Sequence, residues 1–184
     1  KELARALDDD ARFGELQLDA LPPSPAKAVS ELAEYDWRSQ EAREKYRVHV
    51  AHVIELGGAS RAASRRAADA IFAMDKQLAV ASLDNVALRD PHATNHKTTF
   101  VELTNLAPNF DWPGYFAAAK LPRSPVNVQQ PGFMKAMDQL FLGTPLASWK
   151  AYLKWHLLRS AAPYLPSAFV KETFAFEEQY LGGA

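Results

Sequence analysis

Apolar residues recur every three or four positions between Tyr46 and Leu56, which is the spacing of one buried helix face. Ser39 precedes this run as a helix cap, and Gly57-Gly58 follows it as a helix stop. A second helix is predicted from a cap at Ser60 to about Leu83, and the short connection predicts an antiparallel hairpin. The predicted apolar stripe of this second helix is Ala67, Ile71, Met74, Leu78 and Val80.

Shorter elements are predicted in the second half of the chain. Thr99 and Glu102 have the spacing of a capping box, which predicts a helix start there. Val126-Asn127-Val128 is the only plausible strand. Other predicted helices run from Asp111-Trp112-Pro113 through Ala119, from Pro131 to about Leu142, from Leu146 to about Ala162 with Thr144 as cap, and from beyond Pro166 to about Tyr180.

Helical signals also begin the chain, as a short helix over Glu2–Leu7 and a second helix over residues 25–35 after Ser24-Pro25. Strand signals are nearly absent and the connections are short. The predicted fold class is therefore all-α, with antiparallel helical hairpins, layered helices and at most one very short strand.

One predicted helix carries a wide aromatic face. Trp149, Tyr152, Trp155 and Leu158 recur at three-residue steps. Such a stripe is typical of a helix that packs into a protein core, so we interpret these residues as core rather than as a ligand site.

The composition is that of a globular protein, with 48% hydrophobic and 23% charged residues among 184 and a net charge of −1. We therefore expect no nucleic-acid partner, and we interpret the basic run from Arg61 to Arg66 as a solvated helix face. The absence of cysteine excludes disulfides and thiolate metal sites. No apolar stretch approaches the roughly 18 residues of a membrane span. The first residue is Lys1 and no signal peptide is visible, so both ends look cut from something longer.

Two histidine pairs have spacings that a metal site could use. His49 and His52 lie three apart on a predicted helix, but the nearby sequence offers no third ligand. His92 and His96 have the separation found in zinc peptidases, but the glutamate that must follow the first histidine is missing. We interpret both pairs as structural.

We also interpret the remaining candidate residues as structural or solvent-exposed rather than functional. His156 is interpreted as a packed helix position and Glu177-Glu178 as a solvated pair. No nucleophile, histidine and acid can be grouped, and no phosphate-binding loop is present. We therefore name no catalytic, cofactor-binding or metal-binding residue.

Several consecutive segments resemble one known family. They are Tyr46-Arg47-Val48-His49-Val50, the stretch from Met74 to Ser82, the loop from Arg89 to Thr98, Phe110-Asp111-Trp112, Val126-Asn127-Val128 followed by Pro131-Gly132-Phe133, and Tyr152 to Arg159 followed by Ala168-Phe169. In this order, across residues 41–184, the sequence resembles the neprilysin family of zinc metalloendopeptidases, including bacterial oligopeptidases of the PepO type.

The resemblance implies a segment of the large helical N-terminal domain, which caps the active site and limits substrates to peptides. The zinc ligands of the H-E-x-x-H motif and a further glutamate would lie beyond residue 184, in a catalytic domain that is the expected partner. Bacterial members of the family are often secreted or held at the cell envelope. The alternative is a helical interaction or scaffold module without enzymatic activity, in a natural, chimeric or artificial chain.

Residues 1–40 carry a different resemblance. The stretches from Leu21 to Val29 and from Tyr35 to Ser39 resemble a part of actinobacterial proteins that contain a von Willebrand A domain. We therefore predict a helical N-terminal arm over residues 1–40, separate from the segment over 41–184.

Overall fold

The computed structural model describes residues 40–84 and 86–181. The helices predicted over Glu2–Leu7 and residues 25–35, and the cap at Ser39, lie outside the described residues. Within them the all-α class is confirmed, because helices follow one another along the chain and the two strands are only two residues long. None of the helices described is both long enough and apolar enough to cross a membrane.

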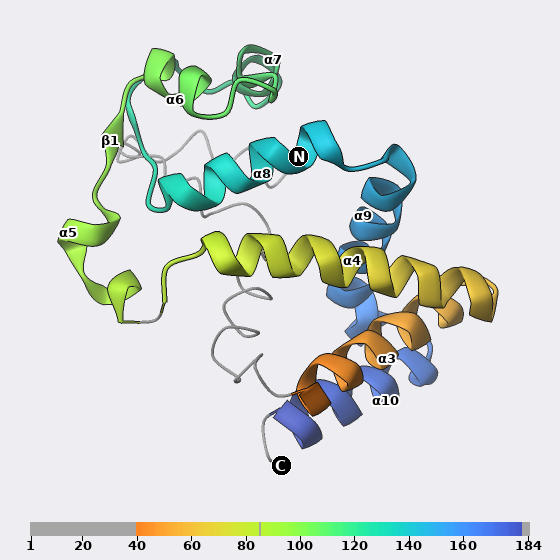
Figure 1. Ribbon diagram of the computed structural model, residues 1–184. Coiled ribbons are helices and arrows are strands. Elements are labelled where there is room, and N and C mark those ends of the chain that lie inside the picture. The colour runs from red at the N-terminus through yellow and green to blue at the C-terminus, as the bar shows by residue number, and fades with distance from the viewer. Residues whose placement is uncertain (1–39, 85, 182–184) are drawn as a thin grey trace.

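The predicted hairpin is formed by α3 (Gln40–Leu56) and α4 (Arg61–Ala81), which pack against each other (Figure 1). Gly58 ends α3 with a φ of 90°, a conformation that favours glycine. Ser60 caps α4 by accepting a hydrogen bond from the backbone N–H of Ala63. A Cβ at position 57 would lie 2.6 Å from Cδ1 of Leu158, so Gly57 permits the close approach of α3 to the later helix that carries Leu158.

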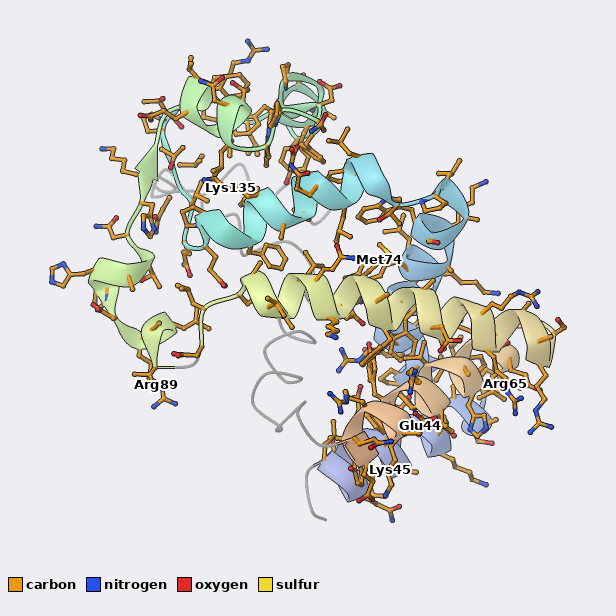
Figure 2. The ribbon with its side chains drawn as sticks, viewed as in Figure 1. Glu44, Lys45, Arg65, Met74, Arg89 and Lys135 are labelled. Carbon is orange, nitrogen blue, oxygen red and sulfur yellow. The ribbon has the colours of Figure 1, made fainter. Side chains whose placement is uncertain are left out.

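The predicted stripe of α4 is correct except at its end. Ile71, Met74 and Leu78 are buried, whereas Val80 is 69% exposed. Two residues rotate a helix by about 200°, which places Val80 on the side opposite Leu78. The outer side of the hairpin is charged, with Glu44, Lys45 and Arg65 among its exposed side chains (Figure 2).

The chain then crosses a series of short elements. The capping box of Thr99 and Glu102 is confirmed, and it opens α6 (Phe100–Leu106). A strand that we did not predict, β1 (Lys97–Thr98), pairs antiparallel with β2 (Val126–Asn127). A two-residue strand has no periodicity to detect, so its partner alone defines it. The other elements are η2 (Ala87–Arg89), α5 (Pro91–Thr94) and α7 (Trp112–Ala118).

These short elements enclose a small core of their own, which consists of Leu103, Ala107, Trp112, Phe116, Val126 and Val128. Its link to the rest of the molecule is α8 (Pro131–Gly143), whose buried Asp138 accepts hydrogen bonds from the backbone N–H and the side-chain amide of Asn109 at 2.8 and 2.7 Å. A buried carboxylate with two donors is well satisfied, so this contact fixes the loop on α8.

Between Leu146 and Leu181 the chain is helical except for a short break at Leu165 and Pro166. This part comprises α9 (Leu146–Ala161), η3 (Ala162–Tyr164), α10 (Ser167–Thr173) and η4, a π-helix over Phe174–Leu181. The predicted cap at Thr144 is wrong, because Thr144 ends α8 and Pro145 precedes α9 without any side-chain capping bond. The predicted final helix changes to the wider π-helix at Phe174.

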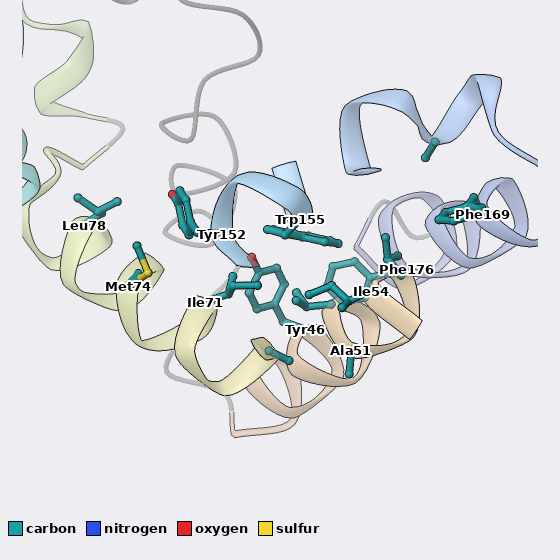
Figure 3. Close-up of a cluster of buried hydrophobic side chains, with 14 of the residues drawn as sticks. Tyr46, Ala51, Ile54, Ile71, Met74, Leu78, Tyr152, Trp155, Phe169 and Phe176 are labelled. Carbon is teal, nitrogen blue, oxygen red and sulfur yellow. The ribbon is translucent and has the colours of Figure 1, made fainter. Parts of the chain in front are cut away.

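The main core lies where α9 meets the α3–α4 hairpin (Figure 3). Trp155 of α9 is 1% exposed, and its ring meets Tyr46 edge to face with a centroid separation of 6.2 Å. The predicted aromatic face is thus confirmed as core. The buried residues include Tyr46, Val50, Val53, Ile54, Ile71, Met74, Leu78, Leu140, Tyr152, Trp155, Phe169 and Phe176.

Replacing Trp155 with alanine should lower the free energy of unfolding by about 3–5 kcal/mol, because it leaves a cavity among packed aromatic rings. Leu153 on the same helix is 64% exposed, so Leu153→Ala should change it by no more than about 0.5 kcal/mol. Urea unfolding followed by circular dichroism measures both. Equal effects of the two substitutions would contradict the assignment of Trp155 to the core.

Candidate functional site

The histidines at positions 92 and 96 do not form a site. His92 is exposed on the short α5, where its backbone N–H is bonded to the capping Asp90. His96 lies just before β1, and its backbone N–H donates to Oδ1 of Asn127 at 2.8 Å. Their main-chain contacts therefore shape the loop and its strand pair.

The pair on α3 has a partner that is distant in sequence. Nδ1 of His49 lies 2.9 Å from Oε1 of Glu172, and Nδ1 of His52 lies 3.3 Å from Oε2 of the same carboxylate. A carboxylate accepts hydrogen bonds, so both histidines donate through Nδ1. We call these three residues the His–Glu cluster, and it joins α3 to α10.

The two histidines have different surroundings. His49 is 2% exposed and lies between Phe176, whose ring stacks on it at 4.4 Å, and the edge of Trp155. The side chain of His52 is 54% exposed and lines two open hollows of about 410 and 540 Å³. The hydrogen bond from His49 lowers the pKa of the Glu172 carboxyl below its usual value, and His52 acts in the same direction. The cluster therefore favours an ionised carboxylate.

A second polar group lies inside the main core. Asp75 of α4 is fully buried, and its Oδ2 accepts a hydrogen bond of 2.6 Å from the Tyr46 hydroxyl. Burial raises the pKa of Asp75 to about 6, against the opposing effects of the Tyr46 hydrogen bond and of the positive charge of Arg159. The core thus contains a carboxyl that changes its charge near neutral pH.

The pKa of His156, on α9, is shifted in the opposite direction to that of Asp75. His156 is half-buried, and its ring lies 4.4 Å, centroid to centroid, from that of Tyr152, a residue of the main core. Burial, helped by Arg159, lowers the pKa of His156 to about 4. His156 is therefore neutral in the folded protein at pH 7, in keeping with the packed position that we predicted.

The two neighbouring glutamates near the C-terminus, Glu177 and Glu178, have different surroundings. Glu177 accepts a hydrogen bond of 2.6 Å from Nε of Arg159, which ties η4 to α9, and its side chain is 28% exposed. Glu178 is exposed. Our interpretation of a solvated pair therefore holds for Glu178, whereas Glu177 belongs to an ion pair.

These residues do not fit a zinc site. A zinc ion needs at least three nitrogen, oxygen or sulfur ligands at about 2.0–2.3 Å around one point. No three His, Asp or Glu side chains within the described parts of the chain are arranged to hold a metal ion. In the His–Glu cluster the facing nitrogens are occupied by the carboxylate itself. We assign no zinc ligand among residues 40–84 and 86–181.

We did not predict from the sequence that Asp75 and Glu172 would be partners of Tyr46 and the two histidines. Asp75 could have been found, because it lies between Met74 and Leu78 on the predicted apolar stripe, and a carboxylate there must be buried. Glu172 offered no signal, since more than 100 residues separate it from His49.

The described chain is thus a helical domain whose buried polar groups join its helices. The family model described as peptidase family M13 matches residues 22–184. The chain belongs to peptidase family M13, which confirms the resemblance to neprilysin-like metallopeptidases. The match includes residues 22–40, and the comparisons give no support to the von Willebrand A resemblance of residues 1–40. The boundary at residue 40 stays a prediction.

The fold is similar to that of zinc metalloprotease ZMP1 of Mycobacterium tuberculosis in three structures. The TM-scores are 0.76 for the open state, 0.71 for the inhibitor complex and 0.69 for a partial open state, at 27–28% identity. These matches cover 80–84% of this chain, and the chain spans only about a quarter of the length of ZMP1.

Two curated relatives match over shorter stretches. Endothelin-converting enzyme 1 of Rattus norvegicus is 25% identical over 132 residues, which is 69% of this chain and 17% of that enzyme. An uncharacterized protein of Mycobacterium tuberculosis is 87% identical over 46 residues, which is 25% of this chain and 7% of that protein. The chain therefore spans a small part of each curated relative.

The substitution Asp75→Asn should change the pH dependence of stability. The pKa of Asp75 is higher in the fold than its ordinary value of 3.8, so folding favours the protonated form. Relative to the variant, the wild-type chain should therefore lose up to about 3 kcal/mol of stability as pH rises from about 4 to 6. Urea unfolding of both proteins across this range measures the difference.

The lowered pKa of His156 has the opposite effect on stability and largely cancels the pH dependence that Asp75 gives the wild-type chain. In Asp75→Asn the effect of His156 alone should appear, as a loss of stability on acidification. Tyr46→Phe is the control, because losing its hydrogen bond raises the pKa of Asp75 and moves the transition to higher pH. Parallel pH profiles of the wild-type chain and Asp75→Asn would contradict the prediction.

Glu172→Gln should destabilise the protein at pH 7 by on the order of 1 kcal/mol, because an amide cannot accept from both histidines through two oxygens. The folded-state pKa of Glu172 is lowered, so its contribution is present above the unfolded pKa and disappears as pH falls through the folded pKa. Thermal unfolding at several pH values measures the difference. Glu178→Gln is the matched control and should have little effect; an equal loss in both variants would argue against the cluster.

Proposed function

We propose that this chain is a non-catalytic segment of a neprilysin-like zinc metalloendopeptidase, and that it forms part of the lid and wall of a chamber for peptide substrates. The observation that carries the proposal is the similarity of its fold to ZMP1 in an open, a partly open and an inhibitor-bound structure. Because the fold is recognisable in structures of different states, it supports a segment that would move as a unit.

The contacts of the main core support such rigidity. Tyr46 and Asp75 join α3 to α4, the His–Glu cluster joins α3 to α10, and the pair of Arg159 and Glu177 joins α9 to η4. A wall of this kind acts by position: it limits the size of what enters and shields the reacting groups from bulk water. Its contribution needs no catalytic side chain of its own.

The proposal assigns the chemistry to another part of the polypeptide. Zinc would act as the Lewis acid of peptide hydrolysis when bound. The described residues do not fit a zinc site, so in this proposal the metal belongs to a catalytic domain that is the partner of this segment. The small share of each relative that the chain spans is consistent with this division.

The second candidate function is a helical interaction module without an enzymatic role. One observation favours it: Leu146, Leu153 and Leu157 of α9 are each more than 60% exposed, and such faces often bind another protein. The encoding gene discriminates between the two candidates. An H-E-x-x-H motif downstream of residue 184 supports the peptidase segment, and an open reading frame without one supports the module.

The isolated 184-residue chain should not hydrolyse a fluorogenic peptide when zinc is added, because its described residues provide no zinc site. Fluorescence release over several hours, with and without a chelator, is the measurement. A full-length enzyme of the family, such as ZMP1 of Mycobacterium tuberculosis, serves as the positive control. Chelator-sensitive turnover by the pure chain would overturn the proposed function.

A further inference from the structure

The exposed apolar side chains are concentrated in the C-terminal part of the molecule. Within residues 40–84 and 86–181, eight of the thirteen exposed large hydrophobic residues lie between Phe141 and Phe174. Leu146, Leu153 and Leu157 of α9 are 69%, 64% and 67% exposed. Their spacing of seven and four residues places them within about 40° of one another around the helix, so they form one stripe, the leucine stripe.

The opposite face of α9 is also apolar. Tyr152 and Trp155 are buried in the main core on that side. A helix with apolar residues on both sides is normally buried on both sides. In contrast, Val80 on α4 is a single exposed residue, and scattered apolar residues of that kind are ordinary on protein surfaces.

Positive charge borders the stripe on one side. Lys150 and Lys154 are exposed and follow the leucines around the helix, at about 40° and 80° from Leu146. Lys154 also donates a hydrogen bond of 2.9 Å to the carbonyl oxygen of Gly57. A partner that covers the stripe would gain from apolar residues against the leucines and acidic residues beside the lysines.

We propose that the leucine stripe is the surface on which another part of the same M13 polypeptide packs, through an apolar helix face with acidic residues at its edge. The inference rests on the proposed function and adds the contact surface. Its occupant is argued from the comparisons, because the fold of this chain occurs in ZMP1, which is about three and a half times as long. Most of such a polypeptide lies outside the matched region and is available to cover α9.

The absence of cysteine makes the stripe easy to probe. Leu153→Cys and Leu157→Cys are made in the 184-residue chain and in the full product of its gene. Maleimide labelling is then followed by peptide mass spectrometry. We expect both positions to be labelled at least about tenfold more slowly in the full product. Val80→Cys, equally exposed on α4, is the matched control and should be labelled at similar rates in both proteins.

Equal labelling at positions 153 and 157 in the two proteins would overturn the inference. A gene that encodes no further family region would overturn it as well. Slowing at position 80 as strong as at the stripe would show general occlusion instead of a contact there. Protection that increases with concentration in the isolated chain would identify a second copy as the occupant, against the proposal.

Peptide hydrolysis by the full product, measured in the same samples, separates this inference from the proposed function. If the full product hydrolyses peptide in a zinc-dependent way but positions 153 and 157 are labelled as fast as in the isolated chain, the proposed function stands and the proposed contact surface is wrong. Protected stripe positions in a product without hydrolytic activity retain the contact surface and remove the peptidase assignment.

Discussion

The packing of the aromatic face of α9 against the α3–α4 hairpin holds the main core together. Trp155 meets Tyr46 and His49 edge to face, and His49 in turn stacks on Phe176 of η4. Helices α9 and η4 therefore both contact His49, on the first described helix. The His–Glu cluster needs α10 to lie beside α3, and the apolar packing places it there, so the polar contact depends on the apolar one.

The core also contains groups whose charge is sensitive to pH. Asp75 is easier to protonate in the fold than in water, and His156 is harder to protonate, both because burial disfavours the charged form. Their effects on stability have opposite signs in the same pH range. A domain built in this way can keep a nearly constant stability across mildly acidic pH while each group alone would change it.

The sequence was sufficient for most helices, because long amphipathic segments show the period of the buried face directly. The errors occurred where the local pattern and the tertiary contact disagree. Val80 continues an apolar run but leaves the buried face, and Thr144 resembles a cap but ends the preceding helix. The role of Glu172 depends on two helices that are far apart in the sequence, and no local spacing encodes it. The burial of Asp75 could have been predicted, because it is a carboxylate on an apolar stripe.

The two sides of α9 explain why a helical segment without an assigned catalytic residue is informative about function. Its inner side packs aromatic residues into the core, whereas its outer side exposes three leucines to solvent. Exposing apolar surface to water is unfavourable in free energy. Core packing alone does not account for this outer side, because the inner side already anchors the helix. The lid or chamber wall that we propose would need both properties: a rigid interior that keeps its shape, and an outer surface that attaches it to the part of the protein carrying the chemistry.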